Sequence, residues 1–286
     1  MRVTSTVCLG GNGMTHARAT IRTMGLGLCV LALGACTATS PKPAETTQNG
    51  RPPGYLAEPT QLTMAEVLPA APQAGSVRYE ADREVFRQTR KLEGSPRWAL
   101  ATSDVKTDIP DMLQDFSCSV GVSLDSARLP RLTQVLKRVE VDTDRITGPA
   151  KKTNQRLRPF LIDEGNICQA KDRLKNSFDY PSGHSTWGWT VGTVLSELAP
   201  DRITPIMLRA RSYAESRVVC GAHNLSAIQM GMLNGATIMM RVQMEPAYQA
   251  DIAAAKKELD AVRASSAPMP EGQCKAERAL ITPVPY

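Results

Sequence analysis

Histidine is scarce in this chain, and both histidines outside the N-terminal segment lie among small and polar residues. The 286 residues include three histidines, His16, His184 and His223. A histidine side chain exchanges protons near neutral pH, and it can also accept a phosphoryl group as a nucleophile. His184 and His223 are therefore the first candidates for catalysis.

The first of these histidines ends the tetrapeptide Pro181-Ser182-Gly183-His184, which opens an apolar segment with helical spacing. A Ser-Gly turn that enters a helix presents free backbone N–H groups and the positive end of the helix dipole to an anion. The same residues could also form an ordinary helix cap with a surface histidine. The tetrapeptide alone does not decide between these two interpretations.

Two further segments supply cations. Arg217 precedes His223 by six residues, and Lys151 precedes Arg158 by seven residues within a basic stretch. A basic stretch by itself is most often a solvated face. Here, however, three segments together provide cations, an anion-binding turn and two histidines, which is the set of groups that phosphoryl transfer requires.

The order of these segments resembles the three-part signature of the type 2 phosphatidic acid phosphatase and vanadium haloperoxidase superfamily. The three parts are Lys151-x6-Arg158-Pro159, Pro181-Ser182-Gly183-His184 and Ser216-Arg217-x5-His223. Three other segments are similar to the class A bacterial non-specific acid phosphatases: Gly94-Ser95-Pro96-Arg97-Trp98-Ala99, Phe116-Ser117-Cys118 and Asp179-Tyr180-Pro181. The resemblance spans residues 62–242 and implies a helical-bundle domain of this type.

The resemblance implies a phosphate-binding role for five residues. Lys151, Arg158 and Arg217 would hold the non-bridging phosphate oxygens, and Ser182 and the backbone N–H of Gly183 would add hydrogen bonds. These groups would stabilise the charge that spreads over the phosphoryl group in the transition state. No metal ion and no cofactor are implied.

The catalytic roles follow from the same resemblance. His223 would attack phosphorus to give a phosphohistidine, and His184 would protonate the leaving alcohol and then activate water. The resemblance therefore implies an acid phosphatase that hydrolyses phosphate monoesters of varied small organic molecules.

One position departs from the family signature, which continues His-x3-Asp. This chain has Ala227 four residues after His223, so the carboxylate that orients the nucleophilic imidazole is missing from its family position. This predicts a weakened enzyme in which Ala227→Asp would raise turnover. The alternative is an impaired pseudoenzyme that binds phosphate or a phosphorylated ligand. A vanadate-dependent peroxidase fits the chain length less well, and a structural lipoprotein would leave the signature unexplained.

Apolar residues recur at three- and four-residue spacing, which predicts an all-α fold. The segments with this spacing are 77–92, 129–139, 186–198, 203–219, 225–242 and 248–262. Helix breakers, among them Gly148-Pro149, separate them. We therefore predict a single helical domain over residues 62–264, followed by an irregular tail over 265–286 that a disulfide holds.

The N-terminal residues are typical of an exported protein. A short apolar run ends in Leu33-Gly34-Ala35-Cys36, which resembles a bacterial lipobox, so residues 1–35 are predicted to be a lipoprotein signal peptide. Cys36 would then carry lipid that anchors the protein in the bacterial cell envelope on the periplasmic side. Ordinary signal cleavage, giving a soluble periplasmic or secreted protein, is the alternative. Residues 36–61 are expected to form a flexible tether.

Export also determines how the cysteines and the charge are interpreted. Four cysteines would remain available in an oxidising compartment, Cys118, Cys168, Cys220 and Cys274, which favours two disulfides. Three pairings are open, and Cys118–Cys168 with Cys220–Cys274 is the favoured one.

Loss of the signal peptide lowers the net charge from +6 to about +3, which is too small to indicate nucleic-acid binding. The oligomeric state is not indicated.

Overall fold

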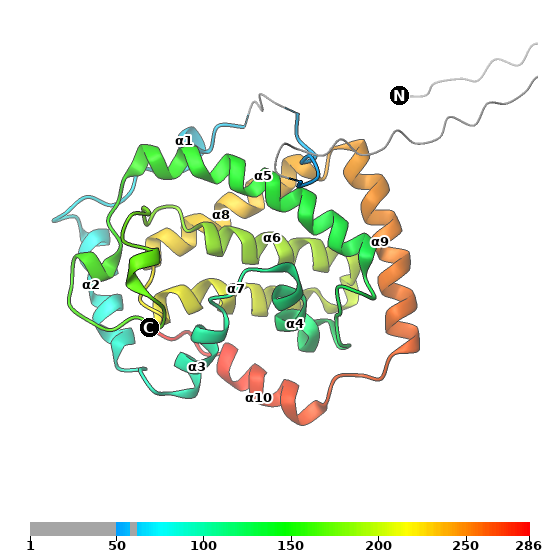
Figure 1. Cartoon of the computed structure of the whole chain (residues 1–286). Coiled ribbons are helices and arrows are strands. Elements are labelled where there is room, and N and C mark those ends of the chain that lie inside the picture. The colour runs from blue at the N-terminus through cyan, green and yellow to red at the C-terminus, as the bar shows by residue number, and fades with distance from the viewer. Residues whose placement is uncertain (1–49, 58–61) are drawn as a thin grey trace, which may run out of the picture. The chain divides into compact units, whose positions relative to one another are not determined.

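The computed structural model describes residues 50–57 and 62–286, and this part of the chain is helical (Figure 1). Within it there is no β-strand, only an isolated bridge between Val122 and Pro268, so the predicted all-α class is confirmed. No helix in these residues combines the length and apolarity that a membrane span requires. The helices are α1 (Met64–Val67), α2 (Val77–Arg90), α3 (Pro96–Ser103), α4 (Ile109–Val120), α5 (Pro130–Asn154), α6 (Gly183–Leu198), α7 (Ile203–Val219), α8 (Leu225–Val242), α9 (Pro246–Ser265) and α10 (Glu271–Ile281), with short 3₁₀ turns at Pro159–Leu161, Lys171–Arg173 and Pro200–Arg202.

Helix α6 packs closely against both α7 and α8 (Figure 1). Glycines make this approach possible. A Cβ added at Gly192 of α6 would lie 2.6 Å from the Cβ of Ala210 on α7, and one added at Gly235 of α8 would lie 2.7 Å from the carbonyl oxygen of Thr186 on α6. Glycine at these contacts therefore sets the spacing of the helices that carry the second and third signature segments.

Ser182 begins helix α6. It occupies the N-cap, and its Oγ accepts a hydrogen bond from the backbone N–H of Ser185 at 3.2 Å. Its own backbone N–H donates to the carbonyl oxygen of Ala227 at 2.9 Å, which fixes this end of α6 on the first turn of α8. The predicted helix start is confirmed, and it lies against α8.

Helix α5 is longer than the sequence predicts. The pair Gly148-Pro149 predicts a break, but α5 continues through it. The proline removes one backbone donor, and the burial of Ile146 and Ala150 on either side offsets that cost. As a result, Lys151 lies in the last turn of a helix that is packed into the domain.

Part of the predicted tether is packed on the domain. The backbone N–H of Tyr55 donates to the Asp142 carboxylate of α5 at 2.6 Å, and the Arg138 guanidinium lies 3.8 Å from the centre of the Tyr55 ring. Tyr55 and Leu56 are both buried. The prediction of a flexible tether is therefore wrong for residues 50–57, because Tyr55 and Leu56 are buried and their backbone N–H groups donate to Asp142 of α5. The signal peptide, Cys36 and the rest of the tether lie outside the described residues.

Two disulfides join the four remaining cysteines, but the predicted pairing is wrong. The bonds are Cys118–Cys274 and Cys168–Cys220. The sequence gives no distance between these cysteines, whereas the packing of α10 brings Cys274 to α4. The predicted irregular tail is corrected by the same observation, since residues 265–286 contain α10, which the first disulfide ties to α4.

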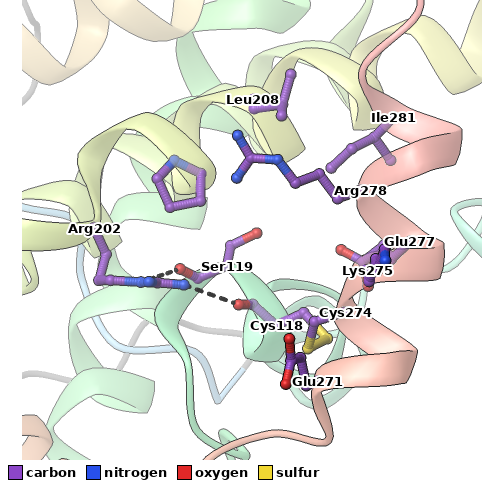
Figure 2. Close-up of a pocket in the computed structure, with 11 residues that line it drawn as sticks. Cys118, Ser119, Arg202, Leu208, Glu271, Cys274, Lys275, Glu277, Arg278 and Ile281 are labelled. Carbon is purple, nitrogen blue, oxygen red and sulfur yellow. Dashed lines mark hydrogen bonds between the residues drawn. A yellow bond between two sulfur atoms is a disulfide. The ribbon is translucent and has the colours of Figure 1, made fainter.

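Helix α10 covers a pocket of about 260 Å³ at the end of α4 (Figure 2). Its lining includes Arg202, which donates to the carbonyl oxygens of Ser119 at 3.0 Å and Cys118 at 3.4 Å. None of the residues of the three-part signature lines this pocket. It is therefore not part of the candidate site described below.

The close contact of α6 with α8 predicts the effect of one substitution. We expect Gly235→Ala to lower the free energy of unfolding by about 1–3 kcal/mol, because its Cβ would press on the carbonyl oxygen of Thr186. Gly272 of α10 is the matched control, since a Cβ there would meet no atom within 4 Å. Gly272→Ala should leave stability unchanged or raise it by up to about 1 kcal/mol. Urea unfolding of the two variants checks this, and equal stabilities would contradict the proposed packing constraint.

Candidate active site

Lys151 and Gly183 meet at the start of α6. The Cε of Lys151 lies 3.7 Å from the position that a Cβ on Gly183 would occupy. The ammonium group of Lys151 donates to the carbonyl oxygen of Phe178 at 2.8 Å. The first signature segment therefore places a cation beside the first amides of α6, which have no carbonyl partner within the helix.

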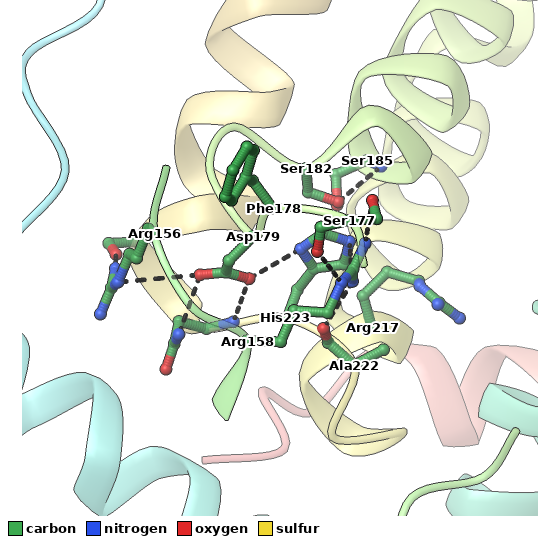
Figure 3. A network of polar contacts seen from close by, with 12 residues as sticks. Arg156, Arg158, Ser177, Phe178, Asp179, Ser182, Ser185, Arg217, Ala222 and His223 are labelled. Atoms are coloured by element: carbon green, nitrogen blue, oxygen red, sulfur yellow. Dashed lines mark hydrogen bonds and ion pairs between the residues drawn. The ribbon is translucent and has the colours of Figure 1, made fainter. Parts of the chain in front are cut away.

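Arg158 extends this cluster toward His223 (Figure 3). Its guanidinium is buried and donates to the carbonyl oxygens of Ser177 and Ala222, both at 2.8 Å, and to the Ser177 hydroxyl at 3.1 Å. Its NH1 group also lies 3.0 Å from Nε2 of His223. Arg158 is thus held on several sides, with one edge against the imidazole.

Asp179 holds the other side of the His223 ring (Figure 3). Its Oδ1 lies 2.8 Å from Nδ1 of His223, and its Oδ2 accepts a hydrogen bond from the side-chain amide of Asn224 at 2.8 Å. A carboxylate only accepts, so we assign the proton of the neutral ring to Nδ1. Nε2 then presents its lone pair, to which Arg158 donates.

The inference that no carboxylate orients the imidazole is therefore wrong. The family position is Ala227, which is buried beside Tyr180, but the carboxylate comes from Asp179 on another segment. Asp179 lies 44 residues before His223 in the chain, so no local spacing rule links the two. The sole signal in the sequence is an aspartate two residues before Pro181, and its side-chain direction depends on the fold.

A second buried network supports Asp179 from behind. Arg156 lies 3.8 Å from Oδ2 of Asp179 and forms an ion pair with Asp82 of α2 at 2.7 Å. Ser226 at the start of α8 donates through its hydroxyl to Asp82 and accepts from Arg156, both at 2.5 Å. These contacts join α2, the segment before α6 and α8 around the carboxylate. Sequence reasoning did not identify any of them.

His184 lies on α6 with its ring stacked on Tyr213 of α7, the ring centres 4.9 Å apart and the planes 6° from parallel. Its Nε2 lies 2.5 Å from the carbonyl oxygen of Asp104. Since a carbonyl only accepts, Nε2 carries a proton and Nδ1 is the nitrogen that can exchange one. The Asp104 carboxylate is itself bound by Arg209 and Ser216 of α7.

Arg217 and Ser182 complete the set of predicted binding residues. The guanidinium of Arg217 is only 2% exposed and donates to Oε1 of Gln169. Its Nε and NH1 atoms are buried and have no hydrogen-bond partner within the described residues. Ser182 Oγ accepts from the Ser185 hydroxyl at 2.9 Å, so its own proton is available to another acceptor. Both residues can therefore donate to a bound anion.

The electrostatics favour an anion at this cluster. Burial, strengthened by repulsion from Arg158, lowers the pKa of Lys151 to about 7, and burial lowers the pKa of Arg217 to about 10. Burial also depresses the pKa of both His223 and His184 well below the usual value, with further lowering by the neighbouring arginines. A bound phosphate would reverse this repulsion. Among the described residues, no group of three or more His, Cys, Asp or Glu side chains could hold a metal ion.

Comparison with known proteins finds a matching family and several relatives of this chain. The model of the PAP2 superfamily matches residues 143–244, which include Lys151, Arg158, His184, Arg217 and His223. An acid phosphatase of Zymomonas mobilis is 38% identical over 214 residues, covering 74% of this chain and 81% of that protein. The non-specific acid phosphatase of Salmonella typhimurium is 32% identical over 196 residues, covering 68% and 78%. That of Providencia stuartii is 28% identical over 207 residues, covering 71% and 84%.

The contact of His223 with Asp179 predicts a large loss when the carboxylate is neutralised. We expect Asp179→Asn to lower kcat for phosphate-ester hydrolysis by about 10²- to 10⁴-fold, because an amide does not fix the ring tautomer or stabilise its charged form. Asp172→Asn is the control, since Asp172 is exposed and pairs only with Lys175 among the described residues. A kcat for Asp179→Asn within about threefold of the control would contradict the orienting role. Ala227→Asp should bring no gain, because Asp179 already occupies Nδ1.

Proposed function

The chain belongs to the PAP2 superfamily and, within it, to the bacterial non-specific acid phosphatases, and from this premise we propose that it hydrolyses phosphate monoesters through a phosphohistidine intermediate without a metal ion. The observation that carries the proposal is the environment of His223. Its Nδ1 is bound by Asp179, and its Nε2 faces the guanidinium of Arg158. A nucleophile needs this combination of a fixed lone pair and a cation for the group that it attacks.

In the first step, Nε2 of His223 attacks phosphorus while the bond to the ester oxygen breaks. Lys151, Arg158 and Arg217 stabilise the charge on the three non-bridging oxygens, together with the backbone N–H of Gly183 and the hydroxyl of Ser182. Arg158 exchanges its contact with Nε2 for a contact with a phosphate oxygen as the new N–P bond forms. The Asp179 carboxylate stabilises the positive charge on the ring.

His184 supplies the proton for the leaving oxygen through Nδ1, since Nε2 is bound to the carbonyl of Asp104. In the empty site, burial and Arg217 keep the pKa of His184 low. The negative charge of the ester raises it again, so the ring takes up a proton together with the substrate. In the second step, Nδ1 removes a proton from water, which attacks phosphorus. The N–P bond then breaks and inorganic phosphate leaves.

The depressed pKa of His223 suits an enzyme that acts in acid. An ordinary histidine has a pKa near 6.5 and would be largely protonated, and not nucleophilic, at pH 5. Burial and the charges of Arg158 and Lys151 lower the pKa of His223, which favours an unprotonated Nε2 at a more acidic pH than an ordinary histidine allows. The same cations that bind phosphate therefore also keep the nucleophile active.

The substrates we propose are phosphate monoesters of varied small alcohols. The relatives from Salmonella and Providencia are named non-specific acid phosphatases. The residues to which we assign substrate binding, Lys151, Arg158 and Arg217, would all contact the phosphate group and not the alcohol. The alternative of an impaired pseudoenzyme depended on the absence of an orienting carboxylate. Because Asp179 supplies an orienting carboxylate from another segment, the site does not favour the alternative.

Trapping of the intermediate tests the mechanism. The purified protein should release p-nitrophenol from p-nitrophenyl phosphate in the presence of a chelator, and vanadate should inhibit it. Mass spectrometry after a rapid quench that avoids acid should find phosphate on His223, and His223→Ala should abolish both signals. Phosphate on Ser182, or activity that a chelator removes and a divalent ion restores, would contradict the proposed chemistry.

The lowered pKa of Lys151 predicts a fall of kcat/KM at high pH. As the pH rises through about 7, Lys151 loses its proton and its charge, so the free enzyme should bind the phosphate group less well. Arginine keeps its charge in this range, so Lys151→Arg should move the fall to higher pH. Measurement of kcat/KM from pH 4 to 9 for both proteins checks this. An unchanged alkaline limb in Lys151→Arg would show that another group causes it.

A further inference from the structure

Arg217 is buried, and within the described residues one side chain forms a hydrogen bond with its guanidinium. Its NH2 group donates to Oε1 of Gln169, while Nε and NH1 are buried without a hydrogen-bond partner in the described part of the chain. Unused donors on a buried guanidinium are costly, and a phosphate would satisfy them. In the empty site, therefore, Gln169 is the side chain that keeps this guanidinium in place.

The Cys168–Cys220 disulfide sets the position of Gln169. Cys168 precedes Gln169 directly, and Cys220 lies three residues after Arg217 at the end of α7. The backbone N–H of Cys168 also donates to the carbonyl oxygen of Cys220 at 3.0 Å. Arg90 of α2 reinforces this junction, because it donates to the carbonyl oxygens of Val219 and Asn166, one on each side. The disulfide thus holds the amide next to the guanidinium.

An amide is chemically suited to this position. A carboxylate would hold Arg217 more strongly, but it would cancel the charge that attracts phosphate and would repel the phosphate itself. A neutral amide oxygen accepts the same hydrogen bond and leaves the net charge of the guanidinium unchanged. The identity of residue 169 therefore affects how well Arg217 binds an anion.

We propose that Gln169 is a positioning residue of the phosphate site, which holds the guanidinium of Arg217 toward the substrate and is itself held by the Cys168–Cys220 disulfide. The proposal rests on the proposed function in one respect, the identity of the anion as a phosphate group. Its test uses the binding of inorganic phosphate, so that it can succeed or fail independently of turnover.

Two substitutions of similar size separate orientation from mere packing. Gln169→Met removes the acceptor, and we expect phosphate to bind about tenfold more weakly by calorimetry, with KM raised more than kcat is lowered. Gln169→Glu keeps the acceptor but adds a negative charge, so phosphate should bind more weakly still, while Tm is unchanged or higher. Equal phosphate affinity in the wild type and both variants would overturn the proposal. Wild-type protein that binds phosphate but does not hydrolyse esters would overturn the proposed function alone.

A double-mutant cycle tests the link to Arg217 directly. Lysine has no planar guanidinium, so Arg217→Lys removes the group that Gln169 orients. In this background Gln169→Met should therefore cause little further loss of phosphate affinity. Additive losses would mean that Gln169 acts independently of Arg217, which the proposal excludes.

The two disulfides provide a matched pair for the second part of the proposal. Removal of Cys168–Cys220 by alanine substitution should weaken phosphate binding about as much as Gln169→Met, and the two changes together should not add. Removal of Cys118–Cys274, which ties α10 to α4, should lower Tm without changing phosphate affinity. Equal losses of affinity from both disulfides would assign the effect to general stability and overturn the role of Cys168–Cys220. If the Cys168–Cys220 variant does not fold, the Gln169 variants still decide the role of the amide.

Discussion

The arrangement of the charged groups depends on the hydrogen bonds of one short segment, residues 177–184. Oxygens of Ser177 hold Arg158, and the carbonyl oxygen of Phe178 holds Lys151. Asp179 holds the imidazole of His223 (Figure 3). The same segment then begins α6 and ends at His184. A displacement of this segment would therefore disturb His223 and two of the three cations together.

The site uses two kinds of acceptor for two different tasks. Neutral oxygens orient the cations, since Lys151 and Arg158 are bound by main-chain carbonyls and Arg217 by the amide of Gln169. A neutral acceptor fixes a direction and leaves the positive charge available for phosphate. The carboxylate of Asp179, in contrast, is directed at His223, where a negative charge is useful because the ring becomes cationic in the attack that we propose. The low pKa values of the site follow from this division, because burial and mutual repulsion are left without a full counter-charge.

The sequence predicts the all-α fold and names candidate phosphate-binding groups, but it does not identify the groups that hold those candidates in place. Helical periodicity and the Ser-Gly turn are local patterns, and each of the three signature segments can be recognised within a short stretch of the sequence. The partners Asp179, Gln169 and Arg156 are placed by contacts between segments that are far apart in the chain. The prediction of the disulfide pairing fails for the same reason, since Cys118 and Cys274 are 156 residues apart. Local sequence contains no distance information of this kind.

The orienting carboxylate is not lost from the site by the alanine at position 227, because Asp179 supplies it from another segment. A carboxylate on α8 would move with that helix and with His223 just before it. Asp179 instead makes the orientation of the imidazole depend on the segment that also holds Lys151 and Arg158. With the carboxylate elsewhere, the small side chain of Ala227 packs on Tyr180, and its carbonyl oxygen receives the N–H of Ser182. Ala227, which lacks the acid, therefore anchors the segment that carries Asp179. The two positions are coupled in this way, so a substitution at one would change which side chain is suitable at the other.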